Sequence, residues 1–377
     1  MSGNGKRSDL RSQHCPFSFC GEQHCRSQKN AHDQGELIKI PESGSCNESR
    51  RFRMKKITDI VKDSGCTGEP FRAPCPLDMG RKQKVSVVAL GDVGTTMVIG
   101  LRLLGEPVIE EIGIFDISRA NMDRLEMEIN QIGWPDREQR PMPPVKTIDE
   151  DEIFHSDLVI FCASRGVPPV EPGTPVTDVR MVQLEANRKI ISHYGELARA
   201  QEFKGLFCVV SDPVDPLCGA FLDASGLEPY QIRGFGLGVM NMRAAYLAER
   251  EERFSPYLKD GRVFGPHGSG LVAANSISDY DDQISRELTE LTTAANLKVR
   301  DLGFKPFIAP ALSSAALSVI SLLQGRWHYS SVFMGKAYLG MRNRLTPDGT
   351  ELEDLDLDPQ LYSRILESYM DLAALRD

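Results

Sequence analysis

The sequence predicts an α/β fold in which a doubly wound parallel sheet is followed by a second, α+β domain. Apolar runs at residues 85–90, 111–115, 157–163 and 206–211 have the composition of strands buried on both faces of a parallel sheet. Helix-like segments around 97–104 and 179–204 lie between them. This alternation of strands and helices is typical of doubly wound sheets, whose ligands bind beyond the carboxyl ends of the strands.

The turn after the first strand carries the features of a dinucleotide-binding βαβ unit. Gly91 would let the chain turn tightly with a positive φ, and Gly94 removes a side chain where the backbone would approach a pyrophosphate. Asp116 ends the second strand, where a carboxylate would accept hydrogen bonds from both ribose hydroxyls and repel a 2′-phosphate. The pattern therefore favours NAD over NADP, although Ala89 replaces the first glycine of the usual triplet.

Composition limits the class of partner. The chain has 377 residues, 41% apolar content and a net charge of −9, with a pI near 5.4. An acidic chain does not predict a nucleic-acid partner, and an anionic substrate would have to be held by local arginines. No apolar run approaches the roughly 18 residues of a membrane span, and the N-terminus has no signal-peptide core. We therefore expect a cytoplasmic protein that does not bind membranes.

The chain is expected to divide into three parts. Residues 1–82 are rich in polar and small residues and predict a mostly disordered extension, with one promising structured piece around 52–61. Residues 83–232 predict a Rossmann-type NAD-binding domain. Residues 233–377 predict a substrate domain with helices around 279–294, 311–323 and 359–375.

Six of the nine cysteines precede the first strand, at positions 15, 20, 25, 46, 66 and 75. Together with His14 and His24, Cys15, Cys20 and Cys25 could hold zinc or an iron–sulfur cluster. However, no paired C-x-x-C is present, so incidental cysteines in a flexible tail are favoured and no metal is predicted. The remaining three, at 162, 208 and 218, lie in or beside apolar runs and are predicted to be buried thiols. The odd total argues against a disulfide framework.

Six segments resemble, in order, those of the lactate and malate dehydrogenase family. They are ALGDVG at 89–94, DLVIFCASRGVPPVEPG at 157–173, VRMVQLEANRKII at 179–191, VVSDPVDPL at 209–217, VMNMRAAYLA at 239–248 and GPHGSG at 265–270. The resemblance covers about residues 84–377. It implies an NAD-dependent dehydrogenase of a small 2-hydroxy acid, similar to L-lactate dehydrogenase, that forms a homodimer or homotetramer.

The resemblance also assigns roles to individual residues. His267 would exchange the hydroxyl proton of the substrate, since a histidine titrates near neutrality and serves as both base and acid. Arg243 would bind the substrate carboxylate, and Arg180 would approach the C2 oxygen as a loop closes. The residues expected to contact the cofactor are Gly91, Val93, Gly94, Asp116, Ala163 and Asp212.

Two positions depart from the family pattern. Asp212 stands where the family has an asparagine that touches substrate and cofactor, so a carboxylate there either holds a proton or meets a different group. Met240 stands where the family has the aspartate that orients the histidine, and a thioether cannot do that. One hypothesis is that Asp212 has become the partner of His267, with catalytic and substrate-binding roles.

The substrate loop reads Val170, Glu171, Pro172, Gly173, without the arginine that accompanies dicarboxylate substrates. A 2-oxo acid with an apolar or cationic side chain is therefore expected in preference to oxaloacetate. Two other functions stay open. A non-catalytic NAD-binding homologue is favoured by Ala89, Asp212 and Met240. An NAD-requiring glycosidase would need a metal, for which no ligand cluster is evident near His267.

Overall fold

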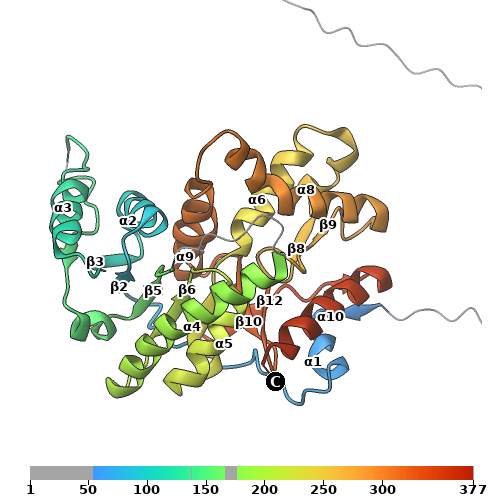
Figure 1. Ribbon diagram of the computed structural model, residues 1–377, viewed down its shortest axis with the longest axis horizontal. Coiled ribbons are helices and arrows are strands. Elements are labelled where there is room, and N and C mark those ends of the chain that lie inside the picture. Colours follow the sequence, from blue (N-terminus) through green and yellow to red (C-terminus); the bar gives the residue numbers. More distant parts are fainter. Residues whose placement is uncertain (1–53, 137, 166–175, 377) are drawn as a thin grey trace, which may run out of the picture. The chain divides into compact units, whose positions relative to one another are not determined.

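The computed structural model describes residues 54–136, 138–165 and 176–376. A nine-stranded sheet runs through this part of the chain, in the order β12-β11-β10-β7-β6-β5-β2-β3-β4 (Figure 1). Six of its strands are parallel: β2 (Gln83–Val88), β3 (Ile109–Phe115), β4 (Val145–Thr147), β5 (Leu158–Phe161), β6 (Leu206–Val209) and β7 (Ile232–Gly234). The four apolar runs predicted as strands are therefore confirmed, and they carry a Rossmann-type order.

The chain changes direction across the sheet at β2. Val85 pairs with Ile112 of β3 on one side and with Leu158 of β5 on the other. From β2 the chain proceeds outward to β3 and β4, and then returns to continue with β5, β6 and β7. The carboxyl ends of β2 and β5 therefore flank the crevice in which sheets of this kind bind their ligands.

Antiparallel strands extend the same sheet beyond β7. They are β10 (His328–Phe333), β11 (Tyr338–Thr346) and β12 (Gly349–Leu352), and Ser331 of β10 pairs with Gly234 of β7. The sheet therefore continues across residue 232, where the sequence analysis placed a domain boundary. A separate two-stranded ladder joins β8 (Arg262–Phe264) to β9 (Val272–Ala274).

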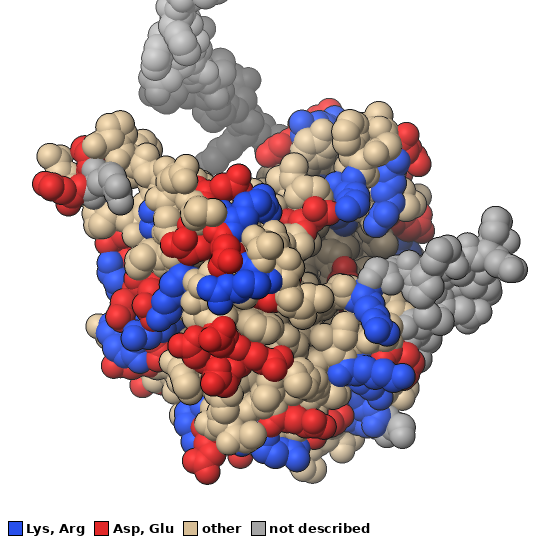
Figure 2. All heavy atoms as spheres, turned by 60° about the vertical axis from the view of Figure 1, so that its left-hand side comes forward, with Lys and Arg blue, Asp and Glu red and all other residues tan. Residues whose placement is uncertain are grey.

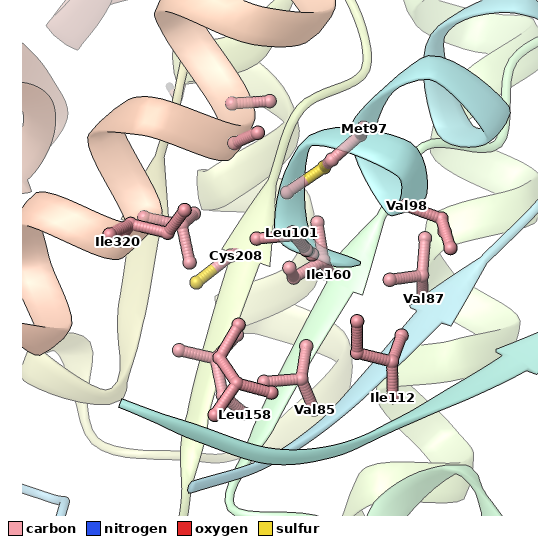
Figure 3. Packing of buried hydrophobic residues seen from close by; sticks show 14 of the residues in the cluster. Val85, Val87, Met97, Val98, Leu101, Ile112, Leu158, Ile160, Cys208 and Ile320 are labelled. Atoms are coloured by element: carbon pink, nitrogen blue, oxygen red, sulfur yellow. The ribbon is translucent and has the colours of Figure 1, made fainter. Parts of the chain in front are cut away.

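Helices cover both faces of the parallel strands. On one face lie α2 (Asp92–Leu104), α3 (Arg119–Asn130), the π-helical turn η4 (Pro310–Ala316) and α9 (Leu317–Leu323). Figure 3 shows Met97 and Leu101 of α2 packed over Ile160 of β5. On the other face α4 (Val176–Ala200) and α5 (Val214–Ser225) pack together, with Leu217 and Phe221 of α5 against the aromatic side chain of Phe207. Since both faces are buried, the strands need no polar alternation.

The remaining helices follow the parallel sheet in the chain. They are α6 (Leu237–Ala248), α7 (Tyr257–Asp260), α8 (Asp282–Asp301) and α10 (Pro359–Ala374), with the short 3₁₀ turn η3 (Glu252–Phe254); two further 3₁₀ turns, η1 (Glu150–His155) and η2 (Pro229–Gln231), precede β5 and β7. The three helices predicted in this region are thus present as α8, as η4 with α9, and as α10. Asp281 and Asp358 cap α8 and α10 by accepting backbone N–H bonds, which explains where these helices begin.

The segment before β2 is folded from Met54 onward. β1 (Lys55–Lys56) pairs with β13 (Asp356–Leu357), and α1 (Asp59–Asp63) follows it. Ile57 and Ile60 are buried in one core with Ile365 of α10. The structured piece predicted around 52–61 is therefore present as β1 and α1, and the described chain continues from it to β2 because its apolar side chains complete the C-terminal core. Residues 1–53, with the candidate metal ligands at 14–25, lie outside the described residues.

The cysteines described by the structure are free thiols. Cys208 and Cys218 are buried and Cys162 is half-buried, in agreement with the prediction. Burial raises the pKa of Cys162 to about 12. In the described part of the chain, no group of three or more His, Cys, Asp or Glu side chains could hold a metal ion. No helix there is long and apolar enough to cross a membrane.

Candidate active site

The turn between β2 and α2 has a positive φ at a residue that is not glycine. Ala89 adopts a positive φ of 71°, which glycine accommodates more easily and which is strained by about 1–2 kcal/mol for other residues. A Cβ on Gly94 would lie 2.0 Å from the Ala89 carbonyl oxygen. The positive φ predicted for Gly91 is therefore found at Ala89 instead, since Gly91 has a φ of −73°, and a Cβ on Gly91 would have no atom within 4 Å. Gly94 is therefore required by packing within the turn, whereas the open space lies at Gly91.

Asp116 is fixed against this turn by the backbone. Its carboxylate accepts hydrogen bonds from the N–H of Leu90 at 2.7 Å and from the N–H of Ser118 at 2.9 Å. The residue after it, Ile117, is 98% exposed. Asp116 therefore sits at the carboxyl end of β3, directly beside the glycine turn, as the sequence predicts.

The first turn of α2 faces the same space. Gly91 precedes the helix and offers no side chain to cap it, so first-turn N–H groups remain available to an anion. Val93 lies in this turn and is half-buried. Asp92 also lies in it, and the ammonium of Lys305 reaches across to its carboxylate at 2.9 Å. The lysine offsets a negative charge that would otherwise oppose a phosphate at this helix end.

Asn187 ties together the loops that follow β5 and β6. Its amide group donates to the Asp212 carbonyl at 2.7 Å and accepts from the Arg165 N–H at 2.9 Å. The Ser211 hydroxyl donates to the Ala163 carbonyl at 2.6 Å. These contacts hold the candidate cofactor residues Ala163 and Asp212 at neighbouring strand ends. Asn187 is fully buried, and sequence reasoning gave it no role although it lies in one of the six matched segments.

The imidazole of His267 is held by a main-chain carbonyl. His267 lies between β8 and β9, and its Nδ1 is 2.8 Å from the carbonyl oxygen of Gly236. A carbonyl only accepts, so Nδ1 carries the proton and Nε2 keeps its lone pair. The hypothesis that Asp212 is the ring partner of His267 is therefore corrected, because Gly236 supplies the acceptor. Met240 is buried and its sulfur accepts from Arg243 at 3.5 Å.

A second buried group holds the main chain of His267. The Asp215 side chain, only 4% exposed, lies against two hydrogen-bond donors, the His267 backbone N–H and the Ser331 hydroxyl. Burial raises the pKa of Asp215 to about 7, and the nearby charge of Asp212 adds to this, while the hydrogen bonds oppose it. Sequence reasoning missed Asp215, although a second acid in SDPVDP at the start of an otherwise apolar helix was a visible signal.

Arg243 supplies a partly buried positive charge next to Asp212. Burial lowers the pKa of Arg243, and the negative charge of Asp212 opposes this shift. Among the residues that the structure describes, no carboxylate oxygen lies within 4.0 Å of its guanidinium. Asp212 itself is exposed at the end of β6. A desolvated guanidinium without an ion-pair partner is suited to binding a carboxylate in a planar, two-point geometry.

Two predicted elements of the site cannot be placed. Arg180 belongs to α4, but its side chain lies outside what the structure describes, and so do Val170 to Gly173 of the loop. Asp212, at the carboxyl end of β6, lies close enough to Arg243 for their charges to interact, and the main chain of His267 lies against Asp215 in the first turn of α5. On the face of the molecule seen in Figure 2, acidic and basic side chains are interspersed.

This arrangement resembles known enzymes both in sequence and in fold. Residues 83–234 match the family model described as lactate/malate dehydrogenase, NAD binding domain. The L-lactate dehydrogenase 2 of Staphylococcus aureus (strain JH9) is 25% identical over 205 residues, which is 53% of this chain and 60% of the relative. That of Peribacillus psychrosaccharolyticus is 26% identical over 223 residues, which is 58% of this chain and 64% of the relative. The matched region thus spans less than two thirds of these relatives.

Solved structures share the fold over a longer stretch. The malate dehydrogenase of Picrophilus torridus matches with a TM-score of 0.62 and 20% identity, over 78% of this chain and 96% of its own. The minor L-lactate dehydrogenase of Enterococcus mundtii matches with a TM-score of 0.63 and 20% identity, over 78% of this chain and 98% of its own. The lactate dehydrogenase of Eimeria maxima, solved with NADH and oxamate, matches with a TM-score of 0.60 and 20% identity, over 79% of this chain and 94% of its own.

Proposed function

We propose that this chain, whose residues 83–234 match the NAD-binding domain of lactate/malate dehydrogenases, is a member of that family and an NAD-dependent oxidoreductase that interconverts a small 2-hydroxy acid and its 2-oxo acid. One observation carries the proposal: the fold supplies both a histidine whose Nδ1 lies against a main-chain carbonyl and, next to Asp212, a partly buried arginine with no ion pair among the described residues. The first group can move a proton, and the second can bind a carboxylate.

The strand ends fit a dinucleotide. The open space at Gly91 and the uncapped first turn of α2 would receive the pyrophosphate, next to Val93 and Gly94. The Asp116 carboxylate would accept from the ribose hydroxyls, while Ala163 and Asp212 would line the nicotinamide end. When bound, NAD accepts the hydride from C2 of the 2-hydroxy acid, or returns it to the 2-oxo acid.

The chain's own residues would handle the substrate and its proton. Arg243 would bind the carboxylate and so orient C2. His267 would accept the hydroxyl proton at Nε2 during oxidation and return it during reduction, with Nδ1–H kept on the Gly236 carbonyl. We propose that Arg180 stabilises the charge on the C2 oxygen, the role that the family resemblance assigns to it.

Asp212 shapes the proposed substrate class. Its carboxylate lies close enough to Arg243 for their charges to interact, so a second carboxylate on a substrate bound by Arg243 would meet a negative charge nearby. A monocarboxylic 2-oxo acid with an apolar or cationic side chain is therefore the proposed substrate, in preference to oxaloacetate.

A non-catalytic NAD-binding role is the second candidate. Met240 favours it, since the ring of His267 has only a neutral acceptor, which stabilises an imidazolium less than a carboxylate would. Assembly into a homodimer or homotetramer stays a prediction.

The deciding experiment is a screen of NADH oxidation across 2-oxo acids, with NADH binding measured in parallel. We expect binding, and turnover that is faster for pyruvate or a bulkier monocarboxylate than for oxaloacetate. A preference for oxaloacetate would contradict the substrate class. Binding without turnover on the whole panel would select the second candidate, and an absence of NADH binding would contradict both. The full chain and a chain that starts at Met54 should both be tested, since the first range of described residues begins there.

A further inference from the structure

We propose that Ser314 is a positioning residue for His267, acting through the main-chain carbonyl of Gly236. The inference rests on the proposed function for its effect on turnover, but its structural part can be measured without any substrate. Ser314 is 2% exposed and belongs to η4, the π-helical turn that packs against α6. Helical segments of this type are often found at functional sites.

The hydrogen-bond directions around Ser314 are fixed by its neighbours. Its Oγ is 2.8 Å from the N–H of Val239, which can only donate, and 2.6 Å from the carbonyl of Gly236, which can only accept. The single hydroxyl proton is therefore committed to Gly236. The same carbonyl oxygen receives Nδ1–H of His267 at 2.8 Å, so its two lone pairs serve two donors.

Ser314 also fixes the backbone that carries this carbonyl. Val239 lies in the first turn of α6, where N–H groups have no partner within the helix. By accepting from Val239 and donating to Gly236, Ser314 holds both sides of the start of α6. Gly236 is buried against His267, since a Cβ there would lie 2.7 Å from the Cβ of His267. The orientation of the carbonyl therefore sets the orientation of the ring.

This arrangement gives a main-chain group the task that a carboxylate performs in other histidine sites. A carboxylate selects one imidazole tautomer by its own charge, whereas a neutral carbonyl selects it only while the carbonyl is held in place. Without the Ser314 hydroxyl, Gly236 would lose one of two donors, and the buried Val239 N–H would lose its acceptor. We expect the start of α6 to loosen and the ring of His267 to populate the Nε2–H tautomer, which cannot act as a base toward the substrate.

The test compares Ser314→Ala with Ser318→Ala in the full chain. Ser318 is a matched control because it is also buried in the same region and donates to a main-chain carbonyl, that of Ser313 at 2.8 Å, without touching Gly236. The first readout is the ¹⁵N–¹H spectrum of the histidine rings, in which a His267→Gln variant identifies the signals of His267 among the seven histidines. The second is kcat and KM for the best substrate of the panel, together with the Kd for NADH.

We expect wild-type His267 to show a single Nδ1–H tautomer and Ser314→Ala to show a mixture. The kcat of Ser314→Ala should fall at least about tenfold, with KM and the NADH Kd within about twofold of wild type. Ser318→Ala should leave tautomer and kcat unchanged. A Ser314→Ala protein with the wild-type tautomer and kcat would overturn the proposal.

Two outcomes are kept separate by the choice of readouts. If Ser314→Ala does not fold, the wild-type spectrum still decides, because an Nε2–H tautomer of His267 in the unmutated chain would overturn the proposal. If no 2-oxo acid is turned over but the tautomer changes only in Ser314→Ala, the proposed function fails and the positioning role of Ser314 stands.

Discussion

The main-chain N–H of Leu90 donates a 2.7 Å hydrogen bond to the Asp116 carboxylate, which joins the glycine turn after β2 to the end of β3. The Ser118 N–H holds the other carboxylate oxygen at 2.9 Å. Two donors thus fix the carboxylate in place, so a ribose would meet an acceptor that needs no rearrangement.

We predict that Asp116→Ser weakens the discrimination between NADH and NADPH. Removal of the carboxylate abolishes its repulsion of a 2′-phosphate and its bonds to the ribose hydroxyls. The ratio of the NADPH Kd to the NADH Kd, measured by fluorescence titration, should fall at least about tenfold. Asp123→Ser is the control, since Asp123 is an exposed acid on α3 that pairs with Arg119. An unchanged ratio in Asp116→Ser would show that another residue selects the cofactor.

The two glycines of the turn should respond differently to alanine. In Gly94→Ala the new Cβ would lie 2.0 Å from the Ala89 carbonyl, so we expect the free energy of unfolding to fall by about 1–3 kcal/mol and NADH binding to weaken. Gly91→Ala meets no atom within 4 Å, so its unfolding should be nearly unchanged while NADH binding weakens. Urea unfolding and NADH titration of both variants check this. Equal stability losses in the two variants would contradict the separation of roles.

Arg243 should matter for the ligand rather than for folding. Arg243→Met removes a partly buried cation that has no carboxylate within 4.0 Å among the described residues, and it keeps an apolar side chain against Met240. We expect the free energy of unfolding, measured in urea, to be unchanged or slightly higher in the variant, because the desolvated charge is gone. Binding of oxamate to the NADH complex should weaken at least about a hundredfold, and Arg243→Lys should lie between. Retained oxamate binding in Arg243→Met would place the carboxylate elsewhere.

Asp215 should make stability depend on pH. Its pKa is raised from 3.8 to about 7 in the folded protein, so the folded state holds a proton that the unfolded chain has released between these values. Its contribution is therefore fully present below about pH 4 and is lost as pH rises to about 7, by a few kcal/mol at most. Asp215→Asn should remove this dependence.

The measurement is the difference in unfolding free energy between wild type and Asp215→Asn at pH 5, 6, 7 and 8. The difference is needed because buried His328, whose pKa burial lowers to about 4, acts in the opposite direction below about pH 6.5 in both proteins. The unfolding free energy of wild type minus that of the variant should fall as the pH rises to about 7 and should then stay constant. A constant difference across this range would show that Asp215 does not titrate there.

The sequence predicted the features that local patterns encode. Apolar runs marked β2, β3, β5 and β6, and the spacing of Gly91, Gly94 and Asp116 marked the nucleotide turn. Unbroken apolar runs were sufficient to predict these strands, because strands buried on both faces have apolar residues at every position.

The partner of the His267 ring could not be predicted in this way. The acceptor is a main-chain carbonyl, which every residue has, and Ser314 lies 78 positions from Gly236 in the chain. The sequence showed only that Met240 lacks the carboxylate of the family pattern, which favoured Asp212, the other departure from that pattern, as the partner of the ring. A contact between a loop, a helix start and a π-helical turn exists only once the fold has brought them together.

The pairing of Lys55 with Leu357 has a topological consequence. The lobe that contains α10 includes residues from Met54 onward, is interrupted by the nucleotide-binding half, and resumes after it. The nucleotide-binding half is therefore inserted within the lobe rather than joined to one end of it. The lobe that contains α10 therefore cannot be cut out as one continuous piece. Circular permutants with new ends in an exposed loop should tolerate rearrangement better than any truncation that removes Ile57 and Ile60.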